Sequence, residues 1–362
     1  MSEQELVRDE IPEPSMVEPG EVQYLTEWQI EENKKCFDKV NGPLYFLGHY
    51  CYVTCGKLIP FELRPYSCEA IFLLHNFKRC ALLFSRQSGK TTTCCLYILW
   101  LAMFNKNQQA LLTSYNYDQT VMKNMATIKT AYEYCPKWLK PGIQVWNESR
   151  IKFDNGSEII AKTTTEDCVR GTSPNIIYSD EMAFCFKGNQ NSQKQFYTSI
   201  SPALSASQGK LVVSSTPLSE FDTFANIYNG SQRFEDDDGK PLPKIYVLRN
   251  DSGSISDLHY FNTKEEAEEY NNEHPELNSK VYERNGEGYN GFISHKVTWR
   301  DLPGRTDEWA RLEKIQMNDD SLFMREYECL SGEEVVSIRL PSGEIRNVTL
   351  KNLYQYYNIN LN

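Results

Sequence analysis

The 362-residue sequence contains no uncharged apolar run of about 18 residues, the length that a membrane-spanning helix needs. Its start, MSEQELVRDEIPEPSMVEPGE, also lacks the basic and apolar regions of a secretory signal peptide. This acidic, proline-containing stretch is typical of a flexible arm. We therefore expect no membrane partner for this chain.

The sequence also lacks a dense block of lysine and arginine, and its net charge is −11. Contacts to nucleic-acid phosphates need clustered cationic side chains, so the overall charge argues against a DNA-binding role. The acidic run at residues 234–238 contributes to this charge and is typical of a solvated loop. A net charge says little about one face of a folded protein, so DNA binding stays open.

Cysteine is plentiful, with 11 residues, and no secretory signal accompanies it. This combination predicts a reducing compartment with free thiols. His49, Cys51 and Cys55 lie close together in GHYCYVTCGK, but a fourth ligand at the usual zinc spacing is missing. The alternation of this segment favours a strand with core cysteines, and a zinc site is the weaker alternative.

Short apolar runs alternate with helical patterns from about Leu58 onward. Buried strands are expected at residues 80–85, 109–114, 175–180 and 210–215, and helices at residues 91–104, 118–134, 263–272 and 307–328. Asn155-Gly156 tolerates positive φ and predicts a hairpin. The alternation predicts an α/β fold with a mainly parallel sheet that is covered on both faces.

The stretch FSRQSGKTTT joins the first of these strands to its helix. The strand ends at Ser85, and Gly89-Lys90-Thr91 opens the helix, which presents backbone N–H groups to phosphate oxygens. Lys90 is suited to the β- and γ-phosphates, and the Thr91 hydroxyl to Mg²⁺. The usual first glycine of the phosphate-loop motif is replaced by Phe84, so the string alone is a weak signal. The candidate phosphate-binding residues are Ser85, Gln87, Ser88, Gly89, Lys90, Thr91 and Thr92.

A second strand, in NIIYSDEMAF, ends in two adjacent carboxylates. Asp180 is placed to hold Mg²⁺, and Glu181 to orient and polarise an attacking water. An ordinary strand that ends in a polar turn is the alternative for this segment alone. Its combination with the upstream strand, GKT turn and helix favours a nucleotide site that uses ATP and Mg²⁺.

A third strand, in KLVVSSTP, ends in the hydroxyls of Ser214, Ser215 and Thr216. In a parallel sheet, this end faces the same crevice as the phosphates. The hydroxyls are suited to sensing the γ-phosphate, although hydroxyl side chains also cap helices.

The segments SRQSGKT, VRGTSPNIIYSDEMAF and VVSSTP, in this order, resemble the ATPase domain of the large terminase subunit of tailed, T-even-like phages. The resemblance spans roughly residues 63–328. It implies a RecA-like P-loop ATPase in the host cytoplasm that drives double-stranded DNA through a portal protein into a procapsid. It also implies a homo-oligomeric ring and a small terminase subunit as partners.

The same resemblance implies roles for individual residues. Lys90 and Thr91 would bind phosphate and Mg²⁺, Asp180 would be the Walker B acid, and Glu181 the catalytic carboxylate. Ser214 to Thr216 match the coupling motif. Arg86 matches the loop arginine that steadies the γ-phosphate, and Arg170, in VRGTS, is a second arginine candidate that would act across a subunit interface.

One departure concerns the nucleotide base. The family usually carries a glutamine for adenine recognition where LRPYS places Ser67. A serine cannot make the bidentate amide contact, so base selectivity is expected to be looser or to come from elsewhere. Tyr66 is a candidate for stacking on the base.

The tail beginning at Cys329 departs from the family pattern. Large terminases continue into an RNase H-like nuclease, whereas CLSGEEVVSIRLPSGEIRN resembles the start of an intein. This resemblance implies an N-terminal split-intein fragment in which Cys329 attacks the carbonyl of Glu328. A complementary polypeptide would supply the remaining intein and the nuclease. The alternative is a truncated sequence in which Cys329 is an ordinary buried residue.

The expected organisation has four parts: an acidic arm and N-terminal subdomain at residues 1–56, the P-loop ATPase core at 57–230, a closing subdomain at 231–328, and the intein-like fragment, a short β-hairpin, at 329–362. Two other functions remain open. A DExH-type helicase would share Asp180-Glu181 and Ser214 to Thr216, but it needs a second RecA-like domain. A nucleotide-binding assembly protein with a truncated C-terminus would hydrolyse ATP poorly.

Overall fold

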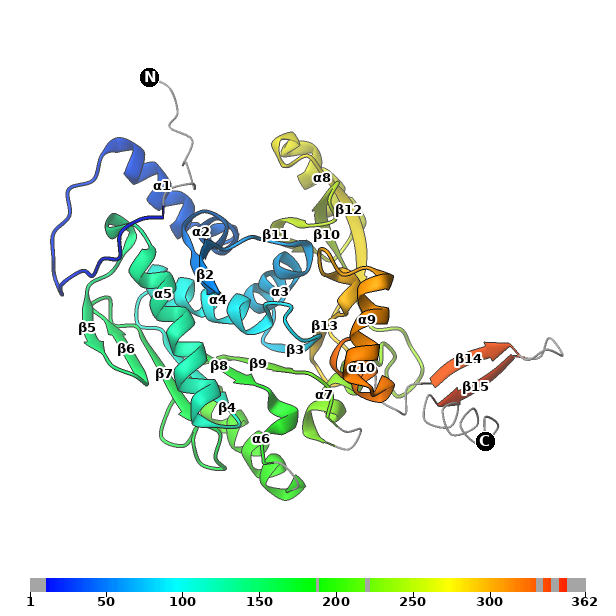
Figure 1. The fold of residues 1–362 in the computed structure, drawn as a ribbon. Helices are drawn as coiled ribbons and strands as arrows, with labels where there is room; N and C mark the ends of the chain where they lie inside the picture. Colours follow the sequence, from blue (N-terminus) through cyan, green and yellow to red (C-terminus); the bar gives the residue numbers. More distant parts are fainter. Residues whose placement is uncertain (1–10, 187–188, 219–221, 330–334, 340–344, 350–362) are drawn as a thin grey trace.

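A computed structural model describes residues 11–186, 189–218, 222–329, 335–339 and 345–349. Its centre is an eight-stranded sheet in the order β13-β3-β9-β8-β4-β7-β6-β5 (Figure 1). The strands from β13 to β7 run parallel, and β6 and β5 are antiparallel additions. The α/β fold with a mainly parallel sheet, expected from the sequence, is therefore confirmed.

The four strands expected from apolar runs form the middle of this sheet. They are β3 (Arg79–Phe84), β4 (Gln109–Ser114), β8 (Ile176–Asp180) and β9 (Lys210–Ser215). Nearly all of their residues are buried, because helices cover both faces. The rest of the sheet comprises β5 (Ile143–Trp146), β6 (Arg150–Phe153), β7 (Glu158–Thr163) and β13 (Ile293–Val297).

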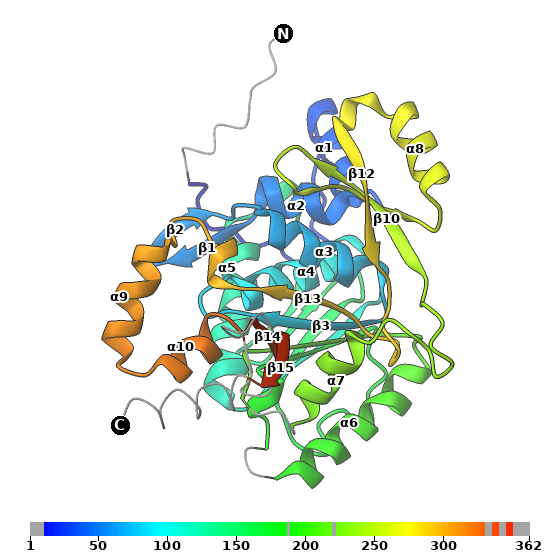
Figure 2. The same ribbon diagram turned by 90° about the vertical axis from the view of Figure 1, so that its right-hand side faces the viewer.

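Helices form a layer on each side of the sheet (Figures 1 and 2). One layer contains α2 (Gly42–Tyr50), α3 (Pro65–Asn76), α4 (Lys90–Phe104) and α5 (Ala126–Tyr134). The other contains α6 (Gln190–Ser205) and α7 (Thr223–Ser231). Two separate hydrophobic clusters fill the spaces between the sheet and these layers.

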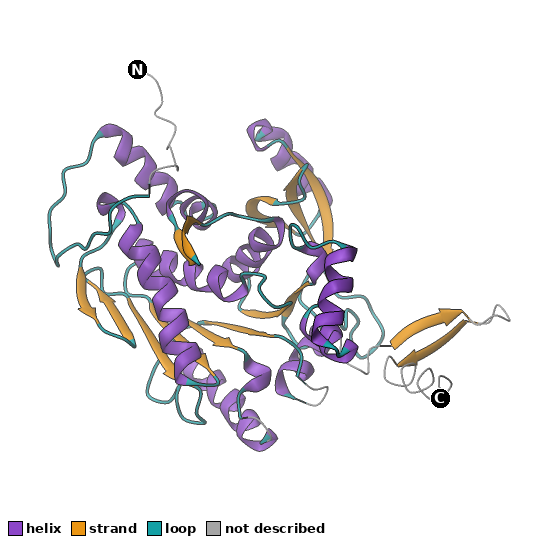
Figure 3. Cartoon of the chain, viewed as in Figure 1, coloured by secondary structure: helices purple, strands orange, loops and turns teal. Residues whose placement is uncertain are grey.

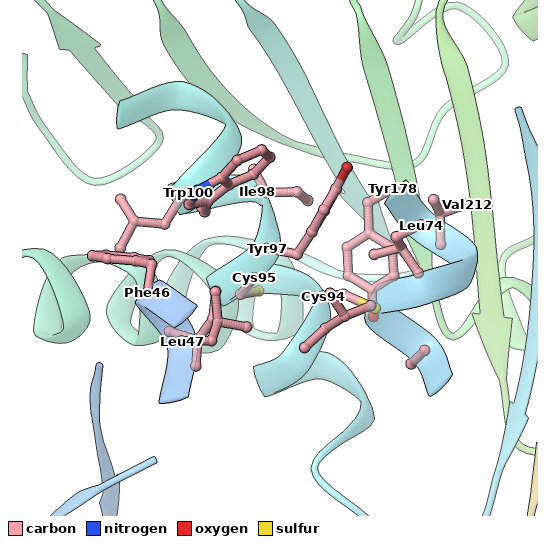
Figure 4. Close-up of a cluster of buried hydrophobic side chains, with 14 of the residues drawn as sticks. Phe46, Leu47, Leu74, Cys94, Cys95, Tyr97, Ile98, Trp100, Tyr178 and Val212 are labelled. Atoms are coloured by element: carbon pink, nitrogen blue, oxygen red, sulfur yellow. The ribbon is translucent and has the colours of Figure 1, made fainter. Parts of the chain in front are cut away.

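Helix α4 is the most deeply buried of these helices. Phe104 of α4 packs edge-on against Phe46 of α2, with 4.9 Å between ring centroids. Cys94 of α4 lies close to Tyr178 of β8 (Figure 4). A helix that is apolar nearly all round belongs in the interior of a protein. Its first turn therefore begins at a fixed place relative to the sheet, which positions the site.

The N-terminal elements are α1 (Glu27–Phe37) and the hairpin of β1 (Tyr52–Cys55) and β2 (Lys57–Pro60). The strand expected through GHYCYVTCGK begins only at Tyr52, because His49 belongs to the last turn of α2. The hairpin expected at Asn155-Gly156 joins β6 to β7.

After Gly230, the chain forms an antiparallel three-stranded sheet and then returns to the main sheet. The three strands, in spatial order, are β11 (Ile255–Phe261), β10 (Lys244–Asn250) and β12 (Ser279–Asn285), with α8 (Lys264–Glu273) beside them. Strand β13 then pairs with β3. The helices α9 (Asp307–Met317) and α10 (Asp320–Glu326) follow.

Loops connect the helices and strands (Figure 3), and several of these connections contain short helical elements. They are the π-helix η1 (Asp118–Met125) and the 3₁₀ turns η2 (Lys137–Leu139), η3 (Met182–Phe184), η4 (Pro275–Leu277) and η5 (Trp299–Asp301). The helix expected at 118–134 is thus divided into η1 and α5. Across the described ranges, no helix is both long and apolar enough to cross a membrane.

In the tail, β14 (Val335–Arg339) and β15 (Ile345–Thr349) form a two-stranded antiparallel sheet. These paired strands agree with the short β-hairpin predicted for the intein-like fragment. The turn and the residues from 350 onward lie outside the described residues.

Candidate functional site

The loop after β3 turns sharply into α4. Gln87 and Gly89 have φ of 59° and 78°, in the left-handed region, and Gly89 caps α4. Glycine adopts this conformation without steric cost, which explains the glycine directly before Lys90. The Ser88 hydroxyl donates to the Ser85 carbonyl over 2.8 Å and holds the loop closed. The sequence pattern therefore produces a loop that ends at a helix N-terminus.

Lys90 lies between the two carboxylates that end β8. Its Nζ is 3.0 Å from Oε1 of Glu181 and 3.2 Å from Oδ1 of Asp180, and its side chain is almost fully buried. Burial acts to lower the pKa of Lys90, but Glu181 and Asp180 outweigh it and raise the pKa above its usual range. The ammonium is therefore a fixed positive charge at this sheet edge.

Asp180 is held by several donors around its carboxylate. The Thr91 hydroxyl donates to Oδ2 and the Ser214 hydroxyl to Oδ1, both over 2.9 Å. Burial alone would raise the pKa of Asp180, but Lys90 and these hydroxyls outweigh it and hold the pKa below its ordinary value. Asp180 and Thr91 thus present an anionic and a neutral oxygen side by side, a donor set that suits Mg²⁺.

Glu181 has a φ of 51°, which is uncommon for a residue other than glycine. The Ser215 hydroxyl and the Thr216 N–H approach its Oε2 at 3.4 and 3.5 Å. Because the backbone turns left-handed here, the Glu181 side chain reaches the cavity while that of Asp180 stays completely buried. The carboxylates that are adjacent in sequence therefore have different surroundings.

A cavity of about 480 Å³ lies over the loop and contains most of the expected residues. Of the expected site residues, its lining includes Ser85, Arg86, Gln87, Ser88, Gly89, Lys90, Thr91, Thr92, Glu181 and Thr216. Asp180, Ser214 and Ser215 lie behind this wall, where Ser214 and Ser215 hold the two carboxylates. The three strand ends and the helix start therefore meet at one place.

The two arginine candidates are not equivalent. Arg86 lines the cavity, but its Nε is 2.6 Å from Oε2 of Glu326. Arg170 is exposed and pairs with Asp167 at 2.8 Å, and it does not line this cavity. The geometry therefore gives no support for a role of Arg170 in this chain's own cavity.

Tyr66 also lies outside the cavity of about 480 Å³ over the loop, which we call the phosphate cavity. Its ring packs edge-on against Phe84, with 6.4 Å between centroids, and it lines a second cavity of about 420 Å³ with Asp301. Arg64 donates to its hydroxyl over 3.0 Å. The neighbouring Ser67 is buried. Stacking of Tyr66 on a base stays a prediction and would require the base to enter this second cavity.

Four lining residues are not among the site residues expected from the sequence: Phe84, Tyr115, Lys123 and Phe184. Phe84 ends β3 directly before the loop. Tyr115 directly follows β4, and Phe184 lies three residues after Glu181, so their positions beside strand ends were a usable signal. Lys123 lies in η1, and nothing in the sequence distinguishes it from a surface lysine.

Cys329 is buried in the cluster between the sheet and α6 and α7, with 1% of its surface exposed. Its thiol donates to the Val297 carbonyl over 3.4 Å, and its φ is 53°. The preceding Glu328 is held by Trp299 and Arg300, at 2.8 and 2.5 Å. The burial of Cys329 is the feature that the truncated-sequence alternative expected.

Comparison with known proteins identifies the family. Residues 81–337, which include the phosphate loop and both carboxylates, match the model of the family described as terminase large subunit, T4likevirus-type, N-terminal. The chain belongs to this T4-like terminase family.

Solved structures of large terminases are similar to this terminase chain, and the HK97 protein shares its fold. The HK97 bacteriophage large terminase is 14% identical and has a TM-score of 0.52, over 83% of this chain and 59% of that one. The Thermus phage P74-26 large terminase ATPase domain is 18% identical, with a TM-score of 0.45, over 74% of this chain and 99% of that one. A large terminase from a thermophilic bacteriophage, in complex with ADP, is 10% identical, with a TM-score of 0.45, over 76% of this chain and 55% of that one. The terminase chain thus spans less than two thirds of the HK97 protein.

Proposed function

We propose that this chain is the ATP-hydrolysing motor part of a phage DNA-packaging terminase. The observation that carries the proposal is the convergence of Lys90, Thr91, Asp180 and Glu181 at the carboxyl edge of the parallel sheet. Ligands of α/β sheets bind at this edge. Membership of the T4-like terminase family supports the proposal independently.

Each residue has a defined task in this proposal. The loop amides and Lys90 bind the phosphates of ATP, and Thr91 and Asp180 hold Mg²⁺, which neutralises phosphate charge. Glu181 takes a proton from water as the water oxygen attacks the γ-phosphorus. The bond from this phosphorus to the β–γ bridging oxygen breaks, and the oxygen leaves with ADP.

Ser214, Ser215 and Thr216 are proposed to sense the loss of the γ-phosphate and to transmit the resulting conformational change to neighbouring elements. Ser214 and Ser215 contact the two carboxylates directly. Arg170, which is exposed and does not line its own chain's cavity, is proposed to complete the site of a neighbouring subunit in a ring. Double-stranded DNA, the portal protein and the small terminase subunit are the proposed partners, in the host cytoplasm.

The helicase alternative gains less support from the geometry. Among the described residues, those after Gly230 form an antiparallel three-stranded sheet and strand β13 of the main sheet. They do not form the second parallel domain that a DExH helicase needs. The assembly-protein alternative differs from the motor only in its rate of ATP hydrolysis, so a measurement of this rate is needed to distinguish the two functions.

The experiment measures Mg²⁺-dependent phosphate release from ATP, with and without double-stranded DNA. We expect Glu181→Gln to lower turnover by about 100-fold or more while ATP binding is retained, because proton transfer contributes this much. Glu273→Gln, at the surface end of α8, is the matched control. Absence of hydrolysis by the wild-type chain with any cofactor or DNA would favour the assembly protein, and unchanged turnover in Glu181→Gln would remove Glu181 from its role.

For the tail, we propose trans-splicing to a complementary intein and nuclease polypeptide, as the pattern from Cys329 favours. Sγ of Cys329 attacks the carbonyl carbon of Glu328, the peptide C–N bond breaks, and the freed amine takes a proton. A separate β14–β15 sheet supports this proposal, whereas burial of Cys329 supports the alternative of an ordinary core residue.

Mixing the chain with a complementary intein fragment separates these two interpretations. Splicing predicts a ligated product whose first segment ends at Glu328, detected by mass spectrometry, and no product from Cys329→Ala. Cys168→Ala, in the same cluster, is the control for the loss of a buried thiol. Ligation by Cys329→Ala would exclude Cys329 as the nucleophile.

A further inference from the structure

The phosphate cavity carries a surplus of positive charge within a chain whose net charge is −11. Its lining includes three cationic side chains, Arg86, Lys90 and Lys123, against the single carboxylate of Glu181. Lys90 is already paired with Asp180 and Glu181, and Arg86 with Glu326. In the described part of the chain, the ammonium of Lys123 has no ion-pair or hydrogen-bond partner.

Lys123 is carried by an unusual helical segment. The π-helix η1 runs from Asp118 to Met125 and then continues as the α-helix α5. π-helical turns are rare and occur frequently at functional sites, because the extra residue per turn changes where side chains point. In η1, Lys123 lines the phosphate cavity while the next residue, Asn124, is completely buried.

Asn124 is a second, independent observation at the same place. Neither its Oδ1 nor its Nδ2 has a hydrogen-bond partner among the described residues. It lines a neighbouring cavity of about 410 Å³, whose wall also contains Thr91, Thr92 and Lys123. Buried amide groups are nearly always paired, so an unpaired one beside the start of α4 marks a strained wall. The π-helical register of η1 thus leaves the Asn124 amide buried without a hydrogen bond, which costs free energy, and it places Lys123 at the cavity.

The order of the strands indicates which phosphate Lys123 faces. Across the sheet, the phosphate loop follows β3, the pair Asp180-Glu181 follows β8, and η1 follows the adjacent strand β4. The inner phosphates belong over the loop amides at the start of α4. The outermost phosphate then lies toward Glu181, on the side from which η1 approaches.

We propose that Lys123 binds the terminal phosphate of the nucleotide, opposite Lys90. This inference rests on the proposed ATPase function and adds a phosphate-binding residue to it. The lysine stem is long and flexible, so the ammonium can follow the γ-phosphate as charge develops on its oxygens. Because ADP lacks this phosphate, the contact distinguishes ATP from ADP.

The test compares Mg²⁺-dependent binding of ATPγS and ADP by calorimetry, in the wild type and in Lys123→Ala. We expect Lys123→Ala to lose roughly tenfold in affinity for ATPγS, the size of one charge-assisted hydrogen bond, and less than about twofold for ADP. Lys123→Arg should keep most of the preference for ATPγS over ADP. In Lys123→Ala, kcat for ATP hydrolysis should fall together with the affinity for ATPγS.

Lys106→Ala is the matched control, because Lys106 is an exposed lysine in the turn between α4 and β4 and lines neither cavity. A preference for ATPγS over ADP that is unchanged in Lys123→Ala would overturn this inference and leave the proposed function intact. A wild-type chain that binds neither nucleotide would overturn the proposed function, and this inference with it. Thermal melts identify any variant that fails to fold.

Discussion

Arg86 of the phosphate loop is bound to Glu326, the last residue of α10, through both side chain and main chain. Its Nε lies 2.6 Å from Oε2 of Glu326, and its N–H donates to the Glu326 carbonyl over 2.9 Å. Arg305 donates to the Arg86 carbonyl over 3.1 Å and stacks on Trp309. The loop after β3 is therefore attached to the segment that ends directly before Cys329.

This attachment predicts the behaviour of Glu326→Gln. Arg86 must leave Glu326 before its guanidinium can reach a phosphate, so removal of the acidic charge should favour the nucleotide-bound position. The Arg86 side chain is largely exposed, so solvent screens its charge and weakens the pair, although the Glu326 carboxylate is buried and also pairs with Arg325. We therefore expect the KM for ATP to fall by only about two- to fivefold, the change that a weak pair allows.

The control for this prediction is Glu308→Gln, since Glu308 forms an exposed pair with Arg311 on α9. Steady-state kinetics provide the measurement. A KM that rises in Glu326→Gln, as it should in Arg86→Ala, would mean that Glu326 helps Arg86 to bind phosphate instead of competing for it.

Replacement of Lys90 by Met should reverse the pH dependence of stability. In the wild type, the pKa of Asp180 lies below its ordinary value, so this group contributes stability above about pH 4 that is lost on further acidification. Without Lys90, burial and the neighbouring Glu181 raise the pKa of Asp180, and its charged form destabilises the fold near neutral pH.

The expected result is that Tm of Lys90→Met rises as the pH falls from about 7.5 to 5, because the raised pKa lets Asp180 take up a proton. In the wild type, Asp180 stays charged between about pH 7.5 and 5, so its titration should change Tm little over this interval. Lys106→Met is the control. Parallel Tm curves for the wild type and Lys90→Met would show that Lys90 does not hold Asp180 in its charged form.

Local sequence patterns predicted the strands and the loop because their causes are local. The apolar runs of β4 and β9 were bounded by the residues at which these strands begin and end. The glycine before Lys90 and the paired acids after β8 likewise mark the site through their own chemistry. These features depend on burial and backbone conformation, which a short stretch of sequence records.

Features that depend on distant contacts could not be predicted in this way. Strand β13 joins the edge of the main sheet beside β3, more than 200 residues away in the sequence. The pairing of Arg86 with Glu326 depends on this return. The π-helical register of η1 was also missed, because its residues have an ordinary helical pattern and the extra residue per turn comes from packing. Lys123 could therefore not be recognised from the sequence as a residue that lines the cavity.

Glu69 of α3 joins the main helical layer to the three-stranded sheet. Its buried carboxylate pairs with Arg249 of β10 and Arg284 of β12. Burial acts to raise the pKa of Glu69, but Arg284, His295 and Arg249 outweigh it and lower the pKa. Glu69→Gln leaves two largely buried guanidinium groups without their counter-charge. This change should lower the free energy of urea unfolding by about 3 kcal/mol.

The matched control is Glu283→Gln on β12, because Glu283 pairs with Lys244 at the surface and its loss should change stability far less. The lowered pKa of Glu69 also means that its contribution is present above about pH 4.5 and is lost on acidification, so the difference between wild type and Glu69→Gln should shrink toward pH 3. Equal effects of Glu69→Gln and Glu283→Gln would mean that apolar packing, and not this ion-pair cluster, holds the three-stranded sheet to α3.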